Sequence, residues 1–201
     1  MKISLAFAWL MSTSLAACSL AACSLLPASE KPEPTLVLPP VSAVGANTLG
    51  FEVDGRAWTT YGQSCFGLFG NGCKDNTLYA SSYRFPGGGR RQLSVSTSLD
   101  TDQHHEFFEL ELDSLGGPGA YAAGRTRTLP LGAPSLYGPT LTDVNKRTDY
   151  VGGTRNAVQV ILTRVDTVQR IVAGTFEGRL EQLAAPGQYV TLRRGRFDVK
   201  Y

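Results

Sequence analysis

The sequence has little excess of either charge. It holds 19 Lys and Arg residues against 17 Asp and Glu, for a formal net charge of +2. This balance lacks the basic footprint of a nucleic-acid-binding domain, so nucleic acid is not expected as a partner. The densest basic stretches, Arg90-Arg91 and residues 193–196, are expected to be solvated faces rather than a patch for anionic lipid or polysaccharide.

Histidine and cysteine are also scarce, with two and four residues respectively. Structural zinc normally takes four Cys or His ligands. His104 and His105 are the only histidines that could join Cys65 and Cys73, and adjacent residues of a strand point to opposite faces. No metal and no cofactor is therefore expected.

A long apolar run is missing as well. The apolar stretch over residues 3–11 is followed by Ser12, Thr13 and Ser14, so it falls short of the roughly 20 apolar residues of a membrane-spanning helix. Preceded by Met1-Lys2, it matches the core of a signal peptide instead. The next residues, "SLAACSLAACS" (14–24), contain Leu-Ala-Ala-Cys twice. This is the pattern of a bacterial lipobox, which is cut before a cysteine that carries diacylglycerol.

Two cysteines could carry the lipid. Cleavage before Cys23 leaves one lipidated cysteine and an even pair, whereas cleavage before Cys18 leaves Cys23 as a free thiol. In an oxidising compartment an even number of remaining cysteines can all form disulfides, which favours Cys23 as the lipidated residue and a signal peptide over 1–22. The alternative is Cys18, with a signal peptide over 1–17. Two acyl chains give a stable membrane anchor. The expected location is the bacterial cell envelope, at the outer rather than the inner membrane because no Asp follows the cysteine.

A proline-rich stretch follows the candidate anchor, with five prolines between residues 24 and 45. Such a composition favours an extended, semi-rigid chain. We therefore expect the lipidated cysteine and a linker over 23–44, which holds the domain off the bilayer. Residues 45–201 are then long enough for one domain with a sizeable core.

The folded part alternates in hydrophobicity with a period of two and offers no convincing amphipathic helix; "EGRLEQLAA" is the best candidate, and it is short. "NAVQVILTRV" is apolar on both faces, as in a central strand. The side chains expected to face the core are Leu93, Val95, Thr97, Leu99, Phe108, Leu110, Leu112, Val172, Phe176, Leu180, Phe197, Val199 and Tyr201. The sequence predicts an all-β fold, a single antiparallel β-sandwich or partly closed β-barrel of about eight to ten short strands.

Glycine marks the expected turns and irregularities. Asp54-Gly55 between "FEV" and "RAW" predicts a type I′ hairpin, which needs φ > 0 at both central residues. Gly174 and Gly178 lie inside an expected strand, where glycine often marks a bulge or the close approach of another backbone.

The chain resembles an uncharacterised family of small bacterial lipoproteins. The resemblance rests on the lipobox, the proline-rich spacer, the opening "GFEVDGRAWTT", and the closing "GTFEGRL" and "GRFDVKY". The members end with a G-x-F-x-G/A strand and a G-R-F-D-V strand. The resemblance implies a β-rich domain in the cell envelope and brings no catalytic residues.

"SCFGLFGNGCKD" places Cys65 and Cys73 at the ends of a glycine-rich loop, and in an exported protein this predicts a disulfide. The overlapping stretch "GQSCFG" resembles the nucleophile elbow G-x-S-x-G, but its second glycine, Gly67, comes one residue late, and the elbow needs a strand-to-helix turn in an α/β sheet. A Cys65–His104 catalytic pair is conceivable, but the disulfide would consume its thiol. Asp100 and Asp102 could share a cation, although a solvated hairpin tip is the simpler interpretation.

Three aromatic residues, Tyr79, Tyr83 and Phe85, share one face of an expected strand. On the solvent side they would suit sugar rings or a protein partner, whereas core packing is the favoured interpretation. The function expected is that of a non-enzymatic, lipid-anchored binding or structural accessory domain with a protein or glycan partner. The alternative is an envelope hydrolase acting on glycans, which requires a pair of carboxylates.

Overall fold

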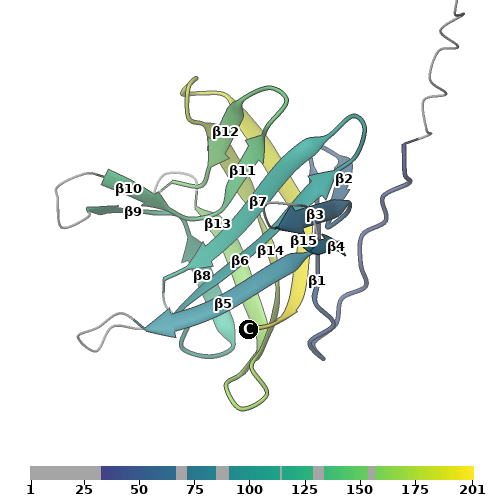
Figure 1. The fold of residues 1–201 in the computed structure, drawn as a ribbon. Coiled ribbons are helices and arrows are strands. Elements are labelled where there is room, and N and C mark those ends of the chain that lie inside the picture. Colours follow the sequence, from purple (N-terminus) through teal and green to yellow (C-terminus); the bar gives the residue numbers. More distant parts are fainter. Residues whose placement is uncertain (1–32, 67–71, 85–90, 114, 129–133, 154–156) are drawn as a thin grey trace, which may run out of the picture. The chain divides into compact units, whose positions relative to one another are not determined.

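The computed structural model describes residues 33–66, 72–84, 91–113, 115–128, 134–153 and 157–201, and the prediction of an all-β fold is confirmed (Figure 1). The strands are β1 (Thr48–Val53), β2 (Arg56–Thr59), β3 (Gln63–Phe66), β4 (Gly72–Asp75), β5 (Leu78–Arg84), β6 (Arg91–Asp100), β7 (His105–Leu112), β8 (Gly119–Ala123), β9 (Arg125–Thr128), β10 (Pro134–Tyr137), β11 (Thr140–Asp143), β12 (Thr148–Val151), β13 (Val158–Asp166), β14 (Ile171–Gln182) and β15 (Tyr189–Lys200). Among these described residues, no helix is long and apolar enough to cross a membrane.

Eleven of the strands form one curled antiparallel sheet, with the order β2-β1-β15-β14-β12-β11-β7-β6-β5. β14 is long enough to pair with two strands along one edge. Its first part pairs with β13, which also pairs with β8, and its last residues pair with β12. Two ribbons, β3–β4 and β9–β10, stand apart from this sheet. More strands are present than expected, because several are only four residues long and too short to show a clear alternation.

A short seam joins the two ends of the sheet. β5 pairs with β6 as far as Thr97, and Tyr61 then forms a parallel bridge to Leu99. The Tyr61 N–H donates to the Ser98 carbonyl at 3.1 Å, and the Asp100 N–H donates to the Tyr61 carbonyl at 2.9 Å. Gly62 has φ +102°, and a Cβ there would lie 2.5 Å from the Asp100 carbonyl oxygen. The seam therefore requires glycine at position 62.

Aromatic rings fill the centre of the barrel. Phe51 stacks on Trp58 with ring centroids 4.7 Å apart and contacts Phe108 at 4.6 Å, and Phe176 lies 5.6 Å from both phenylalanines. All the side chains predicted to face the core are buried except Tyr201, which is half-buried and packs against the core. Truncating one of these central rings to alanine should cost about 3–5 kcal/mol.

The local predictions from glycine are confirmed. Asp54 and Gly55 have φ of 48° and 86°, as the hairpin between β1 and β2 requires. The pairing of β14 with β15 shifts register between Phe176 and Gly178. A Cβ on Gly174 would lie 2.5 Å from the Ile161 carbonyl oxygen, which shows the close approach of β13.

β13 is a central strand, as "NAVQVILTRV" predicts, because it pairs with β14 on one side and β8 on the other. Only one of its faces packs on the core, however, and Ile161 on the other face is 54% exposed. The stretch "EGRLEQLAA", judged too short for a convincing helix, forms the end of β14 and the following turn.

Residues 33–46, called the strap below, lie against the barrel, although residues 33–44 were expected to be part of a semi-rigid linker. The compact unit begins at Glu33. The strap runs beside β1 and β15 in Figure 1. Pro39 packs on β1, where a Cβ on Gly50 would lie 2.5 Å from its Cδ, and Arg164 donates to the Ala43 carbonyl at 2.6 Å. The remainder of the expected linker, 23–32, lies outside the described residues.

Candidate functional site

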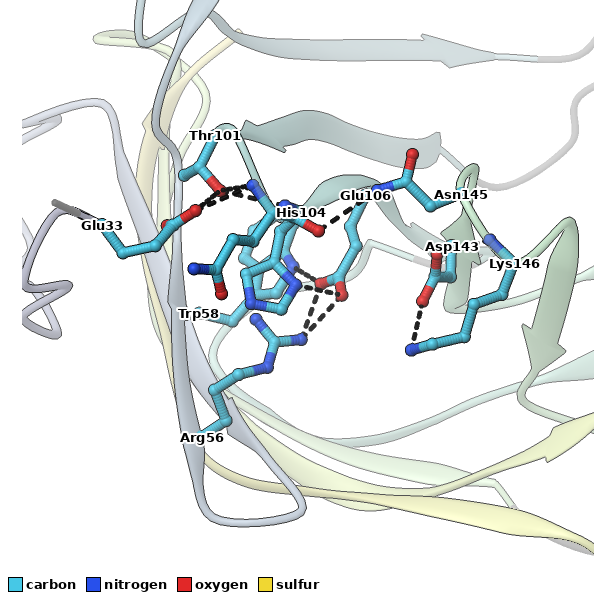
Figure 2. Close-up of polar contacts among 10 residues, drawn as sticks. Glu33, Arg56, Trp58, Thr101, His104, Glu106, Asp143, Asn145 and Lys146 are labelled. Carbon is cyan, nitrogen blue, oxygen red and sulfur yellow. Dashed lines mark hydrogen bonds and ion pairs between the residues drawn. The ribbon is translucent and has the colours of Figure 1, made fainter. Parts of the chain in front are cut away.

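One end of the barrel is called the mouth below. A buried carboxylate lies there. Glu106, at the start of β7, is 5% exposed. It accepts hydrogen bonds from Arg56 Nη2 to both oxygens at 2.8 Å and from the Trp58 indole N–H at 2.7 Å. His104 Nδ1 lies 3.6 Å from the same carboxylate. Figure 2 shows these side chains converging on Glu106 from β2 and from the residues before β7.

A second ion pair lies beside this cluster. Asp143, at the end of β11, is buried, and Lys146 in the following turn donates to it from Nζ at 2.7 Å and from its backbone N–H at 3.0 Å. Burial raises the pKa of the Asp143 carboxyl, but these hydrogen bonds and the charges of Lys146 and His104 outweigh it, so its pKa lies below the usual range. The pKa of Lys146 is raised by the same hydrogen bond and by the charge of Asp143.

A cavity of about 260 Å³ opens between the two pairs. Its lining combines both charge signs with apolar walls: Val53, Asp54, Arg56, Glu106, Leu141, Asp143, Lys146, Tyr150 and Val190. Arg56 Nη1 is buried and has no hydrogen-bond partner among the described residues. The cavity thus offers a buried cationic donor beside carboxylate and phenol groups, which suits a small polar ligand.

The strap reaches the rim of the mouth. Glu33 accepts hydrogen bonds from Thr101 Oγ1 at 3.1 Å and from the Gln103 N–H at 2.8 Å. Thr101 Oγ1 in turn accepts the His104 N–H at 3.0 Å, so the strap supports the loop that carries His104. Figure 2 shows Glu33 on the side of this loop away from Asp143.

The strap is held at its other end by Asp198 of β15, which is 1% exposed. Its carboxylate accepts the Ser42 hydroxyl at 2.7 Å and the backbone N–H groups of Val44, Gly45 and Ala46 at 2.8, 2.7 and 3.2 Å. Burial raises the pKa of Asp198, but these four hydrogen bonds outweigh it, and the pKa lies below its ordinary value. The alternation of "GRFDVKY" places Asp198 on the face opposite Phe197 and Val199, and Asp198 is buried there because the strap covers it.

The polar residues singled out in the sequence separate in the structure. His104 faces the mouth, whereas His105 pairs with Asp100 on the exterior, so the two histidines do diverge as expected. Asp102 is exposed in the turn before β7. No group of three or more His, Cys, Asp or Glu residues suited to a metal ion occurs in the part of the chain that the structure describes.

The aromatic candidates lie mainly on the surface. Tyr79 is 48% exposed and Tyr83 is 41% exposed, so the core interpretation is wrong for these two. They alternate with Leu78 and Ala80, which pack against the core. Phe85 lies outside the described residues.

Two of the four cysteines lie within the described residues. Cys65 and Cys73 are opposite each other in the pairing of β3 with β4. The candidate anchors Cys18 and Cys23 lie outside the described residues.

The charged residues of the mouth were not identified from the sequence, although a signal was present. Glu106 has the same parity as Phe108, Leu110 and Leu112, so the alternation places it on the inner face of β7. Asp143 likewise shares the parity of Leu141. A carboxylate on the same face of a strand as core residues is the signal that would identify these two acids.

Comparisons with protein-family models, with curated proteins and with solved structures find no match for this chain.

Proposed function

We propose that this protein is a lipid-anchored component of the bacterial cell envelope whose barrel binds a small polar ligand, either a glycan or a polar segment of a protein. The signal peptide and lipobox pattern over residues 1–24 support the anchor. The docked strap supports a close tether, because the chain from Cys23 to Glu33 spans no more than about 36 Å at full extension. Ser24, rather than Asp, after Cys23 favours the outer membrane.

The mouth is the proposed binding site. The observation that carries this proposal is the buried and unpartnered Nη1 of Arg56 beside the cavity. A buried guanidinium N–H without a partner is costly, and a ligand oxygen would satisfy it. Asp54, Lys146 and Tyr150 add donors and acceptors around it, as hydroxyl-rich ligands require.

Binding is favoured over hydrolysis of glycans by the state of the two acids. A glycosidase needs a carboxylic acid that keeps its proton near neutral pH beside a second carboxylate. The pKa of Asp143 is lowered, and Glu106 is engaged by Arg56 and Trp58. Neither acid of the mouth is therefore arranged as a proton donor, and we propose a non-enzymatic role for the mouth.

The ligand is best sought with a glycan array and with pull-down from envelope extracts, using the detergent-solubilised mature protein. Arg56→Gln should abolish binding of any specific ligand, while Arg147→Gln, in the exposed turn after β11, should not. Circular dichroism verifies that both variants are folded. Equal binding by the two variants would rule out the mouth as the site.

Labelled palmitate tests the anchor. Incorporation should survive Cys18→Ala and vanish with Cys23→Ala. The reverse result would assign the lipid to Cys18, and a mature protein without acyl mass would refute the anchor altogether.

A disulfide between Cys65 and Cys73 is also proposed. Their direct pairing in the β3–β4 register supports it. Non-reducing mass spectrometry should find the two residues joined; alkylation of both thiols without a reductant would contradict the proposal.

A further inference from the structure

A second cavity lies at the far end of the barrel from the mouth. The strand β14 spans roughly 40 Å between its first and last residues. Its last residues pair with Tyr150 and Val151 near the mouth, and its first residues follow the turn that contains Thr167 and Arg170. This turn lines a cavity of about 380 Å³ together with Ser82, Tyr83, Arg91 and Tyr201.

Among the described residues, the side chains that line this far-end cavity include two guanidinium groups and no carboxylate. Asp166, in the same turn as Arg170, is already engaged by Arg164 and by two backbone N–H groups. The cavity therefore keeps a positive charge, in contrast to the balanced mouth.

The donors of the far-end cavity are held in place by the fold. Arg91 Nη1 donates to the Tyr201 hydroxyl at 3.0 Å, which orients its guanidinium. Arg170 adopts a φ of 55° in the tight turn, and its carbonyl accepts the Tyr201 N–H at 3.0 Å. The guanidinium of Arg91 and the backbone of Arg170 are thus fixed relative to Tyr201.

A buried hydroxyl adds a further donor. Ser82 is paired with Leu93 in the register of β5 and β6, so its side chain lies on the inner face of the sheet. Its Oγ is buried and has no hydrogen-bond partner among the described residues. A hydroxyl donor beside two guanidinium groups matches the acceptor oxygens of a tetrahedral oxyanion.

We propose that the far-end cavity binds a phosphate-type oxyanion, either free or as the phosphoryl group of a sugar phosphate. Arg91 and Arg170 supply the charge and Ser82 supplies a buried donor. The exposed ring of Tyr83 at the rim can contact the sugar when the phosphate is esterified. This site is independent of the lipid anchor and of the mouth.

Isothermal titration calorimetry of the detergent-solubilised mature protein tests this proposal, with inorganic phosphate, glucose 1-phosphate and glucose as probes in low-salt chloride buffer. Both phosphates should bind and glucose should not. Arg170→Gln should weaken phosphate binding at least about tenfold. Arg147→Gln is the matched control, because Arg147 also has a positive φ, 51°, in an exposed turn, but at the mouth.

The three probes separate the sources of the oxyanion. Tighter binding of glucose 1-phosphate than of phosphate would identify a sugar phosphate, and equal affinities would identify the free ion. No measurable heat with either phosphate, equal binding of glucose, or equal loss in Arg147→Gln would overturn the proposal. Arg91→Gln should reproduce the loss; if it unfolds, Arg170→Gln alone decides, because its side chain lies in an exposed turn.

Discussion

The mouth and the strap each bury a carboxylate, and they neutralise it by different means. Glu106 of β7 is met by the guanidinium of Arg56 and the indole of Trp58, both on β2 at the end of the sheet order. Asp198 is met by a hydroxyl and three backbone N–H groups of a segment more than 150 residues away in the sequence. The first arrangement fixes side chains around a cavity. The second fixes a stretch of chain that has no regular secondary structure of its own.

The largest effect should follow removal of the mouth carboxylate. Glu106→Ala leaves the Arg56 and Trp58 donors without an acceptor inside the barrel, and it should lower the free energy of unfolding by about 3–5 kcal/mol. Urea denaturation measures this, with Glu177→Ala on the exposed face of β14 as the control, which should change stability by no more than about 0.5 kcal/mol. A similar small change in both variants would contradict the structural role of Glu106.

Removal of the strap carboxylate should have a smaller and more local effect. Asp198→Asn places an amide N–H₂ among N–H donors and should cost about 2–3 kcal/mol at pH 7. The pKa of Asp198 is lowered in the folded protein, so its contribution is present above the ordinary Asp pKa of 3.8 and is lost as the pH falls through its folded pKa.

The Asn variant should therefore lose less stability on acidification than the wild type. Hydrogen exchange at Val44, Gly45 and Ala46 should accelerate in the variant at pH 7, while exchange in β6 should not. Unchanged exchange in the strap would show that other contacts hold it.

Glu111 is a third partly buried carboxyl, and unlike Glu106 and Asp198 it has acidic neighbours. Burial, with the charges of Glu109 and Asp113, raises the pKa of Glu111 to about 7. The unfolded chain ionises this group near 4.5, so the wild type should lose stability as the pH rises from 4.5 to 7. Glu111→Gln should flatten this slope and gain about 1–2 kcal/mol at pH 8, since partial exposure screens the full effect. Urea denaturation at pH 5 and pH 8 checks it; parallel curves for both proteins would disprove the raised pKa.

The smallest effect should come from the end of the strap at the mouth. Glu33 is partly exposed, and Glu33→Gln keeps one acceptor oxygen, so it should cost about 0.5 kcal/mol. The Gln103 amide should nevertheless exchange faster in this variant, measured by hydrogen exchange. An effect as large as that of Asp198→Asn would show that the two ends of the strap act together.

Much of the fold could be predicted from the sequence, because alternation and turn chemistry are local. The inner faces of β6 and β7 and the Asp54-Gly55 hairpin depend on residues that are close together in the chain. The sequence also predicts that Tyr79 and Tyr83 share one face of their strand. Which face meets the core depends on contacts with other strands, and Leu78 and Ala80 on the opposite face make those contacts.

The candidate sites could be predicted far less well, since they depend on contacts between distant segments. Asp198 is buried by residues 42–46, and Arg91 meets Tyr201 across 110 positions of sequence. Neither contact leaves a periodic signal. Glu106 could have been found from its parity with Phe108, but its role depends on Arg56, which no local pattern links to β7.

The bridge between Tyr61 and Leu99 has a consequence for how this protein would come apart. It is a short closure between the two ends of one curled sheet, and a side chain at position 62 would clash with the Asp100 backbone and force it open. Gly62→Ala should therefore expose the unpaired backbone edges of β2 and β6 to neighbouring molecules. This variant would keep its aromatic core and its ion pairs, and yet it would aggregate with other copies through the exposed strand edges.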